Sequence, residues 1–288
     1  MPKKNLRVSI VIPAYNEQDH LVACLQAISK QTVKPYEVIV VDNNSSDNTA
    51  AIAKSFDFVT LLHERRQGVV YARDLGFDAA GGDIIGRIDA DTILPLDWTS
   101  QVQKIFSESH YGAVTGSVHY YDAPLARVID GIDLACRKWL APHLGDYVYL
   151  LGSNMALSAS AWRAVRSSVC HGQKLHEDED LAIHLGKLGY KVGFIPELHA
   201  AVSGRAIDTS PLDFWHYAYA NVYTYKQHRI SEVRAMYPIV ILILICYLPL
   251  RILYRGFDER SRRFAWRRIL TPHVLGRVNP TTFLVVPD

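Results

Sequence analysis

The sequence has only four cysteines, Cys24, Cys136, Cys170 and Cys246, and no two of them form a CxxC pair. This spacing argues against a disulfide framework and against a zinc knuckle, and it is typical of a protein in a reducing compartment. The 12 histidines include no HExxH motif and no paired ligand spacing, so the sequence predicts no zinc site.

The sequence also lacks a large excess of positive or negative charge. The formal net charge is only +2, which gives no general reason to expect nucleic acid as a partner. The basic start MPKKNLRVSIVIPAYNE contains an apolar run that is short and ends at Pro13, so we expect no signal peptide. With 49% hydrophobic and 21% charged residues, the 288-residue chain can form one large α/β domain, with or without an appendage.

Apolar, β-branched runs alternate with helical patterns over the first third of the chain. Strands are expected at residues 7–15, 36–42, 59–64 and 83–91. Helices are expected at residues 16–31 and 68–82. Another helix is expected to begin after Asp47 or Asn48, either of which can serve as its N-cap. This alternation predicts an α/β fold with a mainly parallel sheet flanked by helices.

The remaining sequence is less regular. Residues 112–121 and 147–158 resemble strands, and a helix is expected to start within residues 158–166. A helix with an acidic N-terminus is expected over residues 176–189, followed by a strand that ends at Pro196. Residues 213–229 are aromatic and helical in composition.

Polar side chains follow three of the predicted strands. Residues 13–17, 42–46 and 89–91 stand at strand ends, where ligands collect in parallel sheets. Asp89 and Asp91 can point the same way because side chains alternate along a strand. By themselves the two carboxylates fit either a solvated strand end or a divalent metal site. Together the three polar ends suggest a phosphate-bearing ligand bound with the help of a cation.

Five stretches occur in the order found in family 2 glycosyltransferases of the GT-A fold. They are VSIVIPAYNE, VIVVDNNSSDNT, GVVYARDLGFDAAGGDIIGRIDADT, LLGSNMALS and HEDEDLAIHLGKLGYKV, and the resemblance covers roughly residues 6–205. It implies an enzyme that transfers a sugar from a nucleotide-diphosphate sugar, with a UDP-sugar favoured, and inverts the anomeric carbon. It also implies Mg²⁺ or Mn²⁺ as cofactor.

The resemblance further assigns residues to the nucleotide. It places Pro13, Tyr15 and Glu17 in the nucleotide pocket, with Glu17 near the ribose, and Asp42 at the base. Arg73 becomes a candidate for contact with the diphosphate, because a guanidinium group suits phosphate geometry.

For the reaction itself, the resemblance makes Asp89 and Asp91 the metal ligands, with Asp89 also close to the nucleotide. Such carboxylates can hold a cation that stabilises the leaving diphosphate. Asp178 matches the general base, and its neighbours Glu177 and Asp180 remain alternatives.

Several positions depart from the family pattern. Asn43 and Asn44 stand where an acid and a glycine are usual, so the base is left open among uracil, guanine and thymine. Asp74 replaces a common asparagine. Two further positions keep two readings each: His199 is a surface residue or a metal neighbour, and Arg205 contacts phosphate or stabilises a loop.

The end of the sequence changes character. Residues 237–250 are almost wholly apolar, fewer than the ~20 needed to span a bilayer, and the basic residues 255–270 include Phe264 and Trp266. A buried helix or a dimer contact could explain the apolar run. The arginines favour the cytoplasmic face of the cell membrane, with a peripheral or short inserted segment and a lipid or lipid-linked glycan as acceptor.

We therefore expect a GT-A catalytic domain over residues 1–210 and a helical, membrane-associated segment over residues 211–288. A nucleotidyltransferase is the first alternative, but residues 13–20 contain no glycine for a phosphate loop. A non-catalytic nucleotide-sugar or glycan-binding module is the second, although it would not need all of the acids.

Overall fold

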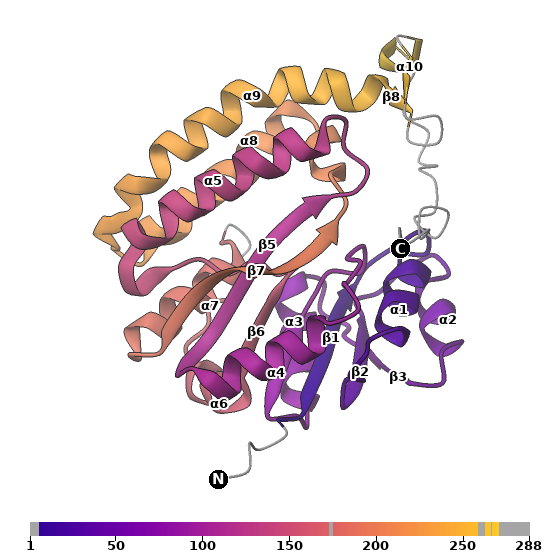
Figure 1. Cartoon of the computed structure of the whole chain (residues 1–288), viewed down its shortest axis with the longest axis vertical. Helices are drawn as coiled ribbons and strands as arrows, with labels where there is room; N and C mark the ends of the chain where they lie inside the picture. The colour runs from indigo at the N-terminus through magenta and orange to yellow at the C-terminus, as the bar shows by residue number, and fades with distance from the viewer. Residues whose placement is uncertain (1–5, 173–174, 259–262, 266, 271–288) are drawn as a thin grey trace.

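The computed structural model describes residues 6–172, 175–258, 263–265 and 267–270, and a single large sheet forms its centre (Figure 1). Seven strands of the described chain lie in the order β3-β2-β1-β4-β6-β5-β7. They are β1 (Val8–Ala14), β2 (Glu37–Asp42), β3 (Val59–His63), β4 (Ile84–Arg87), β5 (Tyr111–Tyr120), β6 (Met155–Ser158) and β7 (Lys191–Val202). Only β6 runs antiparallel to its neighbours in this sheet, so the predicted mainly parallel arrangement is confirmed.

Helices cover both faces of the sheet, and each face has its own hydrophobic cluster. The first cluster contains residues of α1 (Leu21–Ser29), α2 (Thr49–Lys54) and α4 (Trp98–Glu108). The second contains residues of α3 (Val69–Ala79), α6 (Ala159–Val165) and α7 (Glu177–Lys187).

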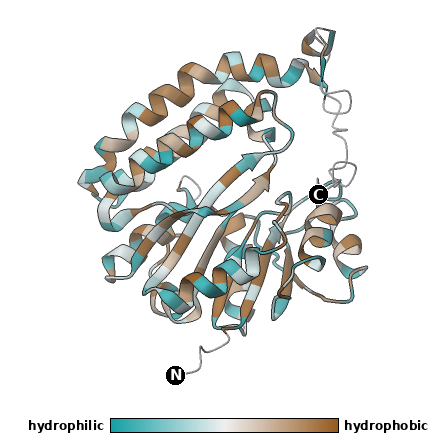
Figure 2. Ribbon diagram, in the orientation of Figure 1, coloured by the Kyte–Doolittle hydropathy of each residue, from teal (hydrophilic) through white to brown (hydrophobic). Residues whose placement is uncertain are grey.

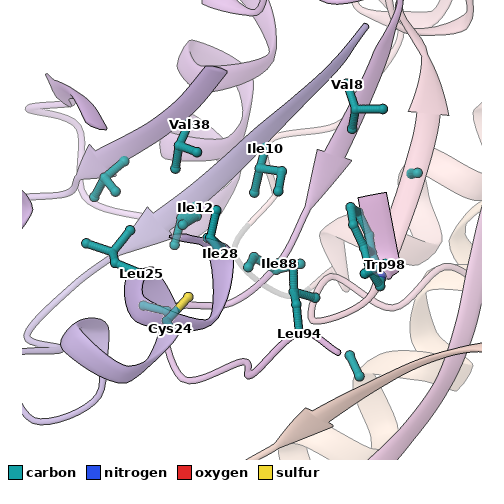
Figure 3. Close-up of a cluster of buried hydrophobic side chains, with 14 of the residues drawn as sticks. Val8, Ile10, Ile12, Cys24, Leu25, Ile28, Val38, Ile88, Leu94 and Trp98 are labelled. Carbon is teal, nitrogen blue, oxygen red and sulfur yellow. The ribbon is translucent and has the colours of Figure 1, made fainter. Parts of the chain in front are cut away.

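Strand β1 shows how the sequence produces this layering. Its apolar side chains alternate, so that Ile10 and Ile12 pack into the first cluster beside Leu25 (Figure 3), while Val11 packs into the second. All seven residues of β1 are buried, which explains why its sequence is mostly apolar and rich in β-branched residues. Burial of each large apolar side chain contributes about 1.5–3 kcal/mol of stabilisation.

The second half of the chain differs from the expectation in three places. The strand expected over residues 147–158 is limited to β6, and helix α5 (Ala126–Leu144) had not been predicted. Strand β7 continues past Pro196 to Val202. It can do so because the pairing of β5 with β7 shifts register next to this proline, which therefore need not donate a ladder hydrogen bond.

Three long helices, α5 and two that follow β7, form a further layer over β5 and β7 (Figure 1). Helix α8 (Pro211–Gln227) confirms the expected aromatic helix, and α9 (Met236–Gly256) contains the apolar run. Both share a hydrophobic cluster with α5 and α7, in which Val222 and Met236 accompany Leu144 and Ile183. The expected boundary near residue 210 therefore falls between elements that share a core.

Short elements complete the described chain. They are η1 (Gly145–Tyr147), η2 (Arg205–Asp208), η3 (Ser231–Ala235), β8 (Phe257–Asp258), β9 (Arg263–Phe264) and α10 (Arg267–Leu270). Part of the basic segment expected at residues 255–270, including Trp266, lies outside the described residues.

Candidate active site

The carboxyl ends of β1, β2 and β4 lie next to one another at one edge of the sheet. Ala14 pairs with Asp42, and β4 continues beyond its last pair by a hydrogen bond from Ile88 N to Val11 O. The segments that follow these strands are therefore brought together, as the sequence predicted.

Asp42 and Tyr15 lie in the part of this edge formed by β1 and β2. Asp42 is buried; its Oδ1 accepts a 3.3 Å hydrogen bond from Ser45 N, and its Oδ2 lies 3.2 Å from His63 Nδ1. Tyr15 is 51% exposed, whereas Pro13 is buried within β1. A ligand can therefore reach the ring of Tyr15 directly, while Pro13 serves to shape the strand end.

The two asparagines that depart from the family pattern have defined structural roles. The side chain of Asn43 bonds the 64–68 loop through Glu64 O at 3.0 Å, Arg66 O at 2.7 Å and Gly68 N at 2.8 Å. Asn44 has a φ of 62°, a left-handed conformation that asparagine tolerates better than most residues. Asn43 thus fixes the loop beside Asp42.

Glu17 and Asp91 meet at one arginine, Arg205. Its Nε lies 3.0 Å from Asp91 Oδ2, and its Nη1 donates a 2.8 Å hydrogen bond to Glu17 Oε2. Burial opposes ionisation of Glu17, but hydrogen bonds with His20 and Arg205 outweigh it, and the pKa of Glu17 is lowered. For Asp91, burial outweighs Arg205, and the nearby charge of Asp89 adds to it, so the pKa of Asp91 is raised.

A second arginine, Arg87 at the end of β4, gathers three more carboxylates. Its Nη1 donates a 2.6 Å hydrogen bond to Asp178 Oδ1, while its Nη2 lies 3.1 Å from Asp89 and 3.0 Å from Glu177. Arg87 is buried, whereas the side chain of Asp89 is 42% exposed. Asp89 therefore reaches from this buried group towards solvent, where a ligand can approach.

Asp178 is held on both of its oxygens. Its Oδ2 accepts a 2.7 Å hydrogen bond from Gly152 N. A Cβ atom at Gly152 would lie 0.9 Å from Arg87 Nη1, so only glycine leaves space for the guanidinium group. Burial raises the pKa of Asp178; Arg87 opposes this shift, and the charge of Glu177 adds to it.

The site carries more acidic than basic groups. Among the described residues, five carboxyl groups share two guanidinium groups, an excess of three negative charges when all are ionised. The acids are Glu17, Asp89, Asp91, Glu177 and Asp178, and the bases are Arg87 and Arg205. Such an oxygen-rich set fits a hard divalent cation such as Mg²⁺ or Mn²⁺.

Arg73 does not join this group at the sheet edge. Its side chain is fully buried, its Nη1 donates a 2.7 Å hydrogen bond to Glu177 O, and its Nη2 donates one of 2.8 Å to Asp74. Because Arg73 is fully buried, the expected contact with a diphosphate would require this side chain to move, and it stays a prediction. In the structure, Arg73 holds the first turn of α7 through its hydrogen bond to Glu177 O.

Arg87 is the site residue that sequence reasoning missed. It precedes Asp89 by two positions in GRIDAD, and the period of a strand places the two side chains on one face. Arg205 was considered for phosphate or for a loop, and in the structure it contacts the acids Glu17 and Asp91. His199 lies on β7, where its Nδ1 is 3.0 Å from Glu197 O.

Comparison with known proteins gives two matching family models. The one described as Glycosyl transferase family 2 matches residues 9–150, and the one described as Glycosyl transferase family group 2 matches residues 84–267. Glycosyltransferase AglE of Haloferax volcanii is 33% identical over 120 residues, which cover 39% of this chain and 40% of the relative. An undecaprenyl-phosphate 4-deoxy-4-formamido-L-arabinose transferase of Serratia proteamaculans is 31% identical over 160 residues, which cover 50% of this chain and 48% of that protein. The chain thus spans less than half the length of either relative.

Solved structures share the fold. A mannosyltransferase, PcManGT from Pyrobaculum calidifontis in complex with GDP-Man and Mn²⁺, superposes with a TM-score of 0.65 at 20% identity, covering 88% of this chain and 75% of that one. S. aureus TarS 1–349 in complex with UDP-GlcNAc gives a TM-score of 0.54 at 13% identity, covering 87% and 80%. The fold is therefore GT-A, as the sequence resemblance implied. Because the model described as Glycosyl transferase family group 2 covers well over half of its length, the chain belongs to this family of glycosyltransferases.

Proposed function

We propose that the chain is a metal-dependent inverting glycosyltransferase that moves a sugar from a nucleotide-diphosphate sugar to a hydroxyl group. The acceptor would be a lipid or lipid-linked glycan at the cytoplasmic face of the membrane. The observation that carries the proposal is the convergence of Asp89 and Asp178 on the single buried guanidinium group of Arg87. It links the expected metal ligand to the expected base, although they lie 89 positions apart in sequence.

Each part of the site has a role in this reaction. Tyr15, Glu17 and Asp42 would hold the nucleoside at the ends of β1 and β2. Asp89 and Asp91 would hold the cation, which supplies Lewis-acid stabilisation of the departing diphosphate. Arg205 forms ion pairs with Glu17 and Asp91, so its side chain can turn from these acids to the diphosphate when a donor binds.

Asp178 would act on the acceptor. Its carboxylate removes the proton of the acceptor hydroxyl, the hydroxyl oxygen bonds to the anomeric carbon, and the bond from that carbon to the diphosphate breaks. The diphosphate leaves with the bonding electron pair. A single displacement of this kind inverts the anomeric carbon. The raised pKa of Asp178 suits a group that must accept a proton.

One observation favours a second acceptor class, a lipid phosphate. Each oxygen of Asp178 already accepts a hydrogen bond, from Arg87 Nη1 or from Gly152 N, which weakens it as a base. A phosphate acceptor is already ionised and needs no base. The matched Serratia protein is named for transfer to undecaprenyl phosphate. In that case Asp178 would keep Arg87 in place and would not act as a base.

Association with the membrane is supported by α9. Residues Ser231–Gly256 form the one segment of the described chain that is long and apolar enough to cross a bilayer, with a mean hydropathy of 2.2 and 11% of its apolar window buried. Its exposed residues Ile241, Ile245, Leu248 and Ile252 repeat at helical spacing and form a stripe. Brown, hydrophobic residues are prominent along this outer helix in Figure 2.

The other side of α9 is fixed to the protein. Tyr247 stacks on Phe214 with ring centroids 3.9 Å apart, and its hydroxyl donates a 2.6 Å hydrogen bond to Thr209 O. Arg255 donates a 2.6 Å hydrogen bond to Asp208. A helix held along one side and apolar along the other suits the plane of the membrane surface better than a crossing. We therefore propose that α9 lies in the interface.

A thermal-shift panel tests the proposed donor and metal. UDP, GDP, dTDP and CDP are each added with and without Mn²⁺ to the wild type and to an Asp89→Asn/Asp91→Asn variant. UDP is our first candidate, and GDP is included because a structure of the same fold was solved with GDP-Man. We expect stabilisation by one nucleotide that requires Mn²⁺ and is lost in the variant. Stabilisation by no nucleotide would favour a binding module without catalysis.

A further inference from the structure

A second cluster of metal-ligand side chains lies around α7, away from the sheet edge. Asp180 and His184 occupy successive turns of α7, Cys170 precedes this helix, and His228 follows α8. One ligand atom from each of the four lies within 4.8 Å of all the others. Asp180 is two residues beyond Asp178, about 200° around the helix, so the two acids point to opposite sides.

The four side chains face one another closely. His228 Nε2 lies 2.7 Å and His184 Nε2 3.5 Å from Asp180 Oδ1, and Cys170 Sγ lies 3.7 Å from His184 Nε2. The backbone N of Cys170 donates a 2.8 Å hydrogen bond to Asp180 Oδ2, which fixes the loop that carries the thiol. Three separate segments therefore direct a thiol, a carboxylate and two imidazoles to one place.

We propose that these four side chains bind one Zn²⁺ ion as a structural site. Zinc takes four protein ligands of the Cys, His and Asp types in closed tetrahedral sites. Bond lengths of about 2.0–2.3 Å imply ligand atoms about 3.3–3.8 Å apart. Two of the three separations given above already lie near this range, and the third needs a movement of about 1 Å. A set with one thiolate and two imidazoles also favours zinc over Mg²⁺ and Mn²⁺.

The protonation states are compatible with zinc. Burial would hinder ionisation of Asp180, but hydrogen bonds from its neighbours lower its pKa to about 2, so it is a carboxylate. Burial lowers the pKa of His228, which favours the neutral ligand form. Burial and Asp180 raise the pKa of the Cys170 thiol to about 11, so binding of zinc would release its proton.

One neighbour must move. Lys187 Nζ lies 3.0 Å from His228 Nδ1, which carries a proton when Nε2 binds a metal and then cannot accept from the lysine. Lys187 is exposed, so its ammonium group can turn into solvent. The site would not take part in the transfer reaction. It would instead tie α8 and the loop at Cys170 to the helix whose other side presents Asp178.

The sequence contains no local signal for this site. Its ligands are separated by 10, 4 and 44 residues, and the two histidines belong to different segments. The expectation that the chain has no zinc site rested on histidine and cysteine motifs with close spacing. Only Asp180 and His184 are close in sequence, and the fold adds Cys170 and His228 to them.

Metal analysis of the full chain, purified in detergent, tests the proposal. The Asp89→Asn/Asp91→Asn variant serves as the background, because it lacks the two acids proposed to hold the cation at the sheet edge. The protein is treated with Zn²⁺, desalted and analysed by mass spectrometry of the metal. We expect about one zinc per chain, with affinity at least about tenfold lower after Cys170→Ser or His228→Gln. Cys136→Ser and His143→Gln, which alter residues outside the cluster, are the matched controls.

Cobalt gives an independent readout. Co²⁺ in place of zinc should show a thiolate-to-metal charge-transfer band that is lost in Cys170→Ser and kept in Cys136→Ser. Circular dichroism confirms that each variant is folded, and if His228→Gln fails to fold, the Cys170→Ser pair decides. Absence of zinc from the folded background protein, or equal zinc and an unchanged cobalt band in Cys170→Ser, would overturn the proposal.

Discussion

Arg87 donates a 2.6 Å hydrogen bond to Asp178, a residue 91 positions later in the chain. The two side chains are buried together, one at the end of β4 and the other in the first turn of α7. Because Arg87 also contacts Asp89, it couples the proposed metal-binding end of the site to the proposed acceptor end. Loss of either partner of such a buried pair leaves an uncompensated charge.

Asp178→Asn separates the two acceptor classes. With a hydroxyl acceptor we expect transfer to fall by at least about 100-fold, because the proton of the hydroxyl then has no base. The affinity for the nucleotide should be unchanged, since Asp178 contacts Arg87 and Gly152. Transfer is measured with labelled donor and nucleotide affinity by calorimetry. Full transfer to a hydroxyl acceptor would refute the base assignment, whereas transfer to polyprenyl phosphate alone would favour the second acceptor class.

Gly152→Ala should disrupt the pair without changing any charge. The new methyl group would occupy the position of Arg87 Nη1, so the guanidinium must leave Asp178. We expect a loss of about 3–5 kcal/mol in the free energy of unfolding, together with loss of transfer. Denaturant titration and the transfer assay measure the two effects.

The matched control is Gly131→Ala, the same substitution at a position with open space around it. Gly131 lies within α5, and a Cβ there would meet no atom within 4 Å. Alanine should stabilise that helix by about 0.5–1 kcal/mol. If Gly152→Ala behaves like Gly131→Ala, Arg87 does not need the space beside Gly152.

Arg205→Gln should strengthen binding of Mn²⁺ in the absence of nucleotide. The change removes a positive charge 3.0 Å from Asp91, so Mn²⁺ no longer competes with the guanidinium group for this acid. We expect an affinity about tenfold higher, or ~1.4 kcal/mol. Free Mn²⁺ is measured by electron paramagnetic resonance. The control is Arg255→Gln, which removes the ion pair between Arg255 on α9 and Asp208 on η2. Equal Mn²⁺ affinities in the two variants would contradict the prediction.

The local sequence pattern was sufficient to predict the first half of the fold and to place most of the acids at one edge of the sheet. Strands β1 and β2 are rich in buried β-branched residues, and the polar residues after β1, β2 and β4 meet because parallel strands finish at one edge. Helix α5 was missed because its sequence mixes charged, apolar and proline residues, and its packing depends on α8 and α9.

The partners of the acids could not be read in the same way. Arg73 and Arg205 were both considered for phosphate, yet one is fully buried beneath α7 and the other reaches the acids from the segment after β7. Each position depends on contacts between residues more than 90 apart in sequence, which local periodicity does not contain.

An Ile241→Asp/Ile245→Asp variant tests the membrane role of α9. Removal of residues beyond Arg234 would also delete Met236 and Tyr254, which are buried, so substitution of the exposed stripe is the cleaner change. Both isoleucines are more than half exposed, and aspartate there should leave the fold intact. Insertion of two charges in place of apolar groups should release the protein from vesicles that contain anionic lipid.

Flotation of the purified chain with such vesicles measures this release. Phe58→Asp, at an exposed aromatic residue before β3, is the matched control and should stay bound. Release should be accompanied by normal Mn²⁺-dependent stabilisation by nucleotide, because α9 contributes no residue to the acidic site. Unchanged flotation of the double variant would show that the stripe does not bind the membrane, and a dimer contact would then be the better explanation for its exposure.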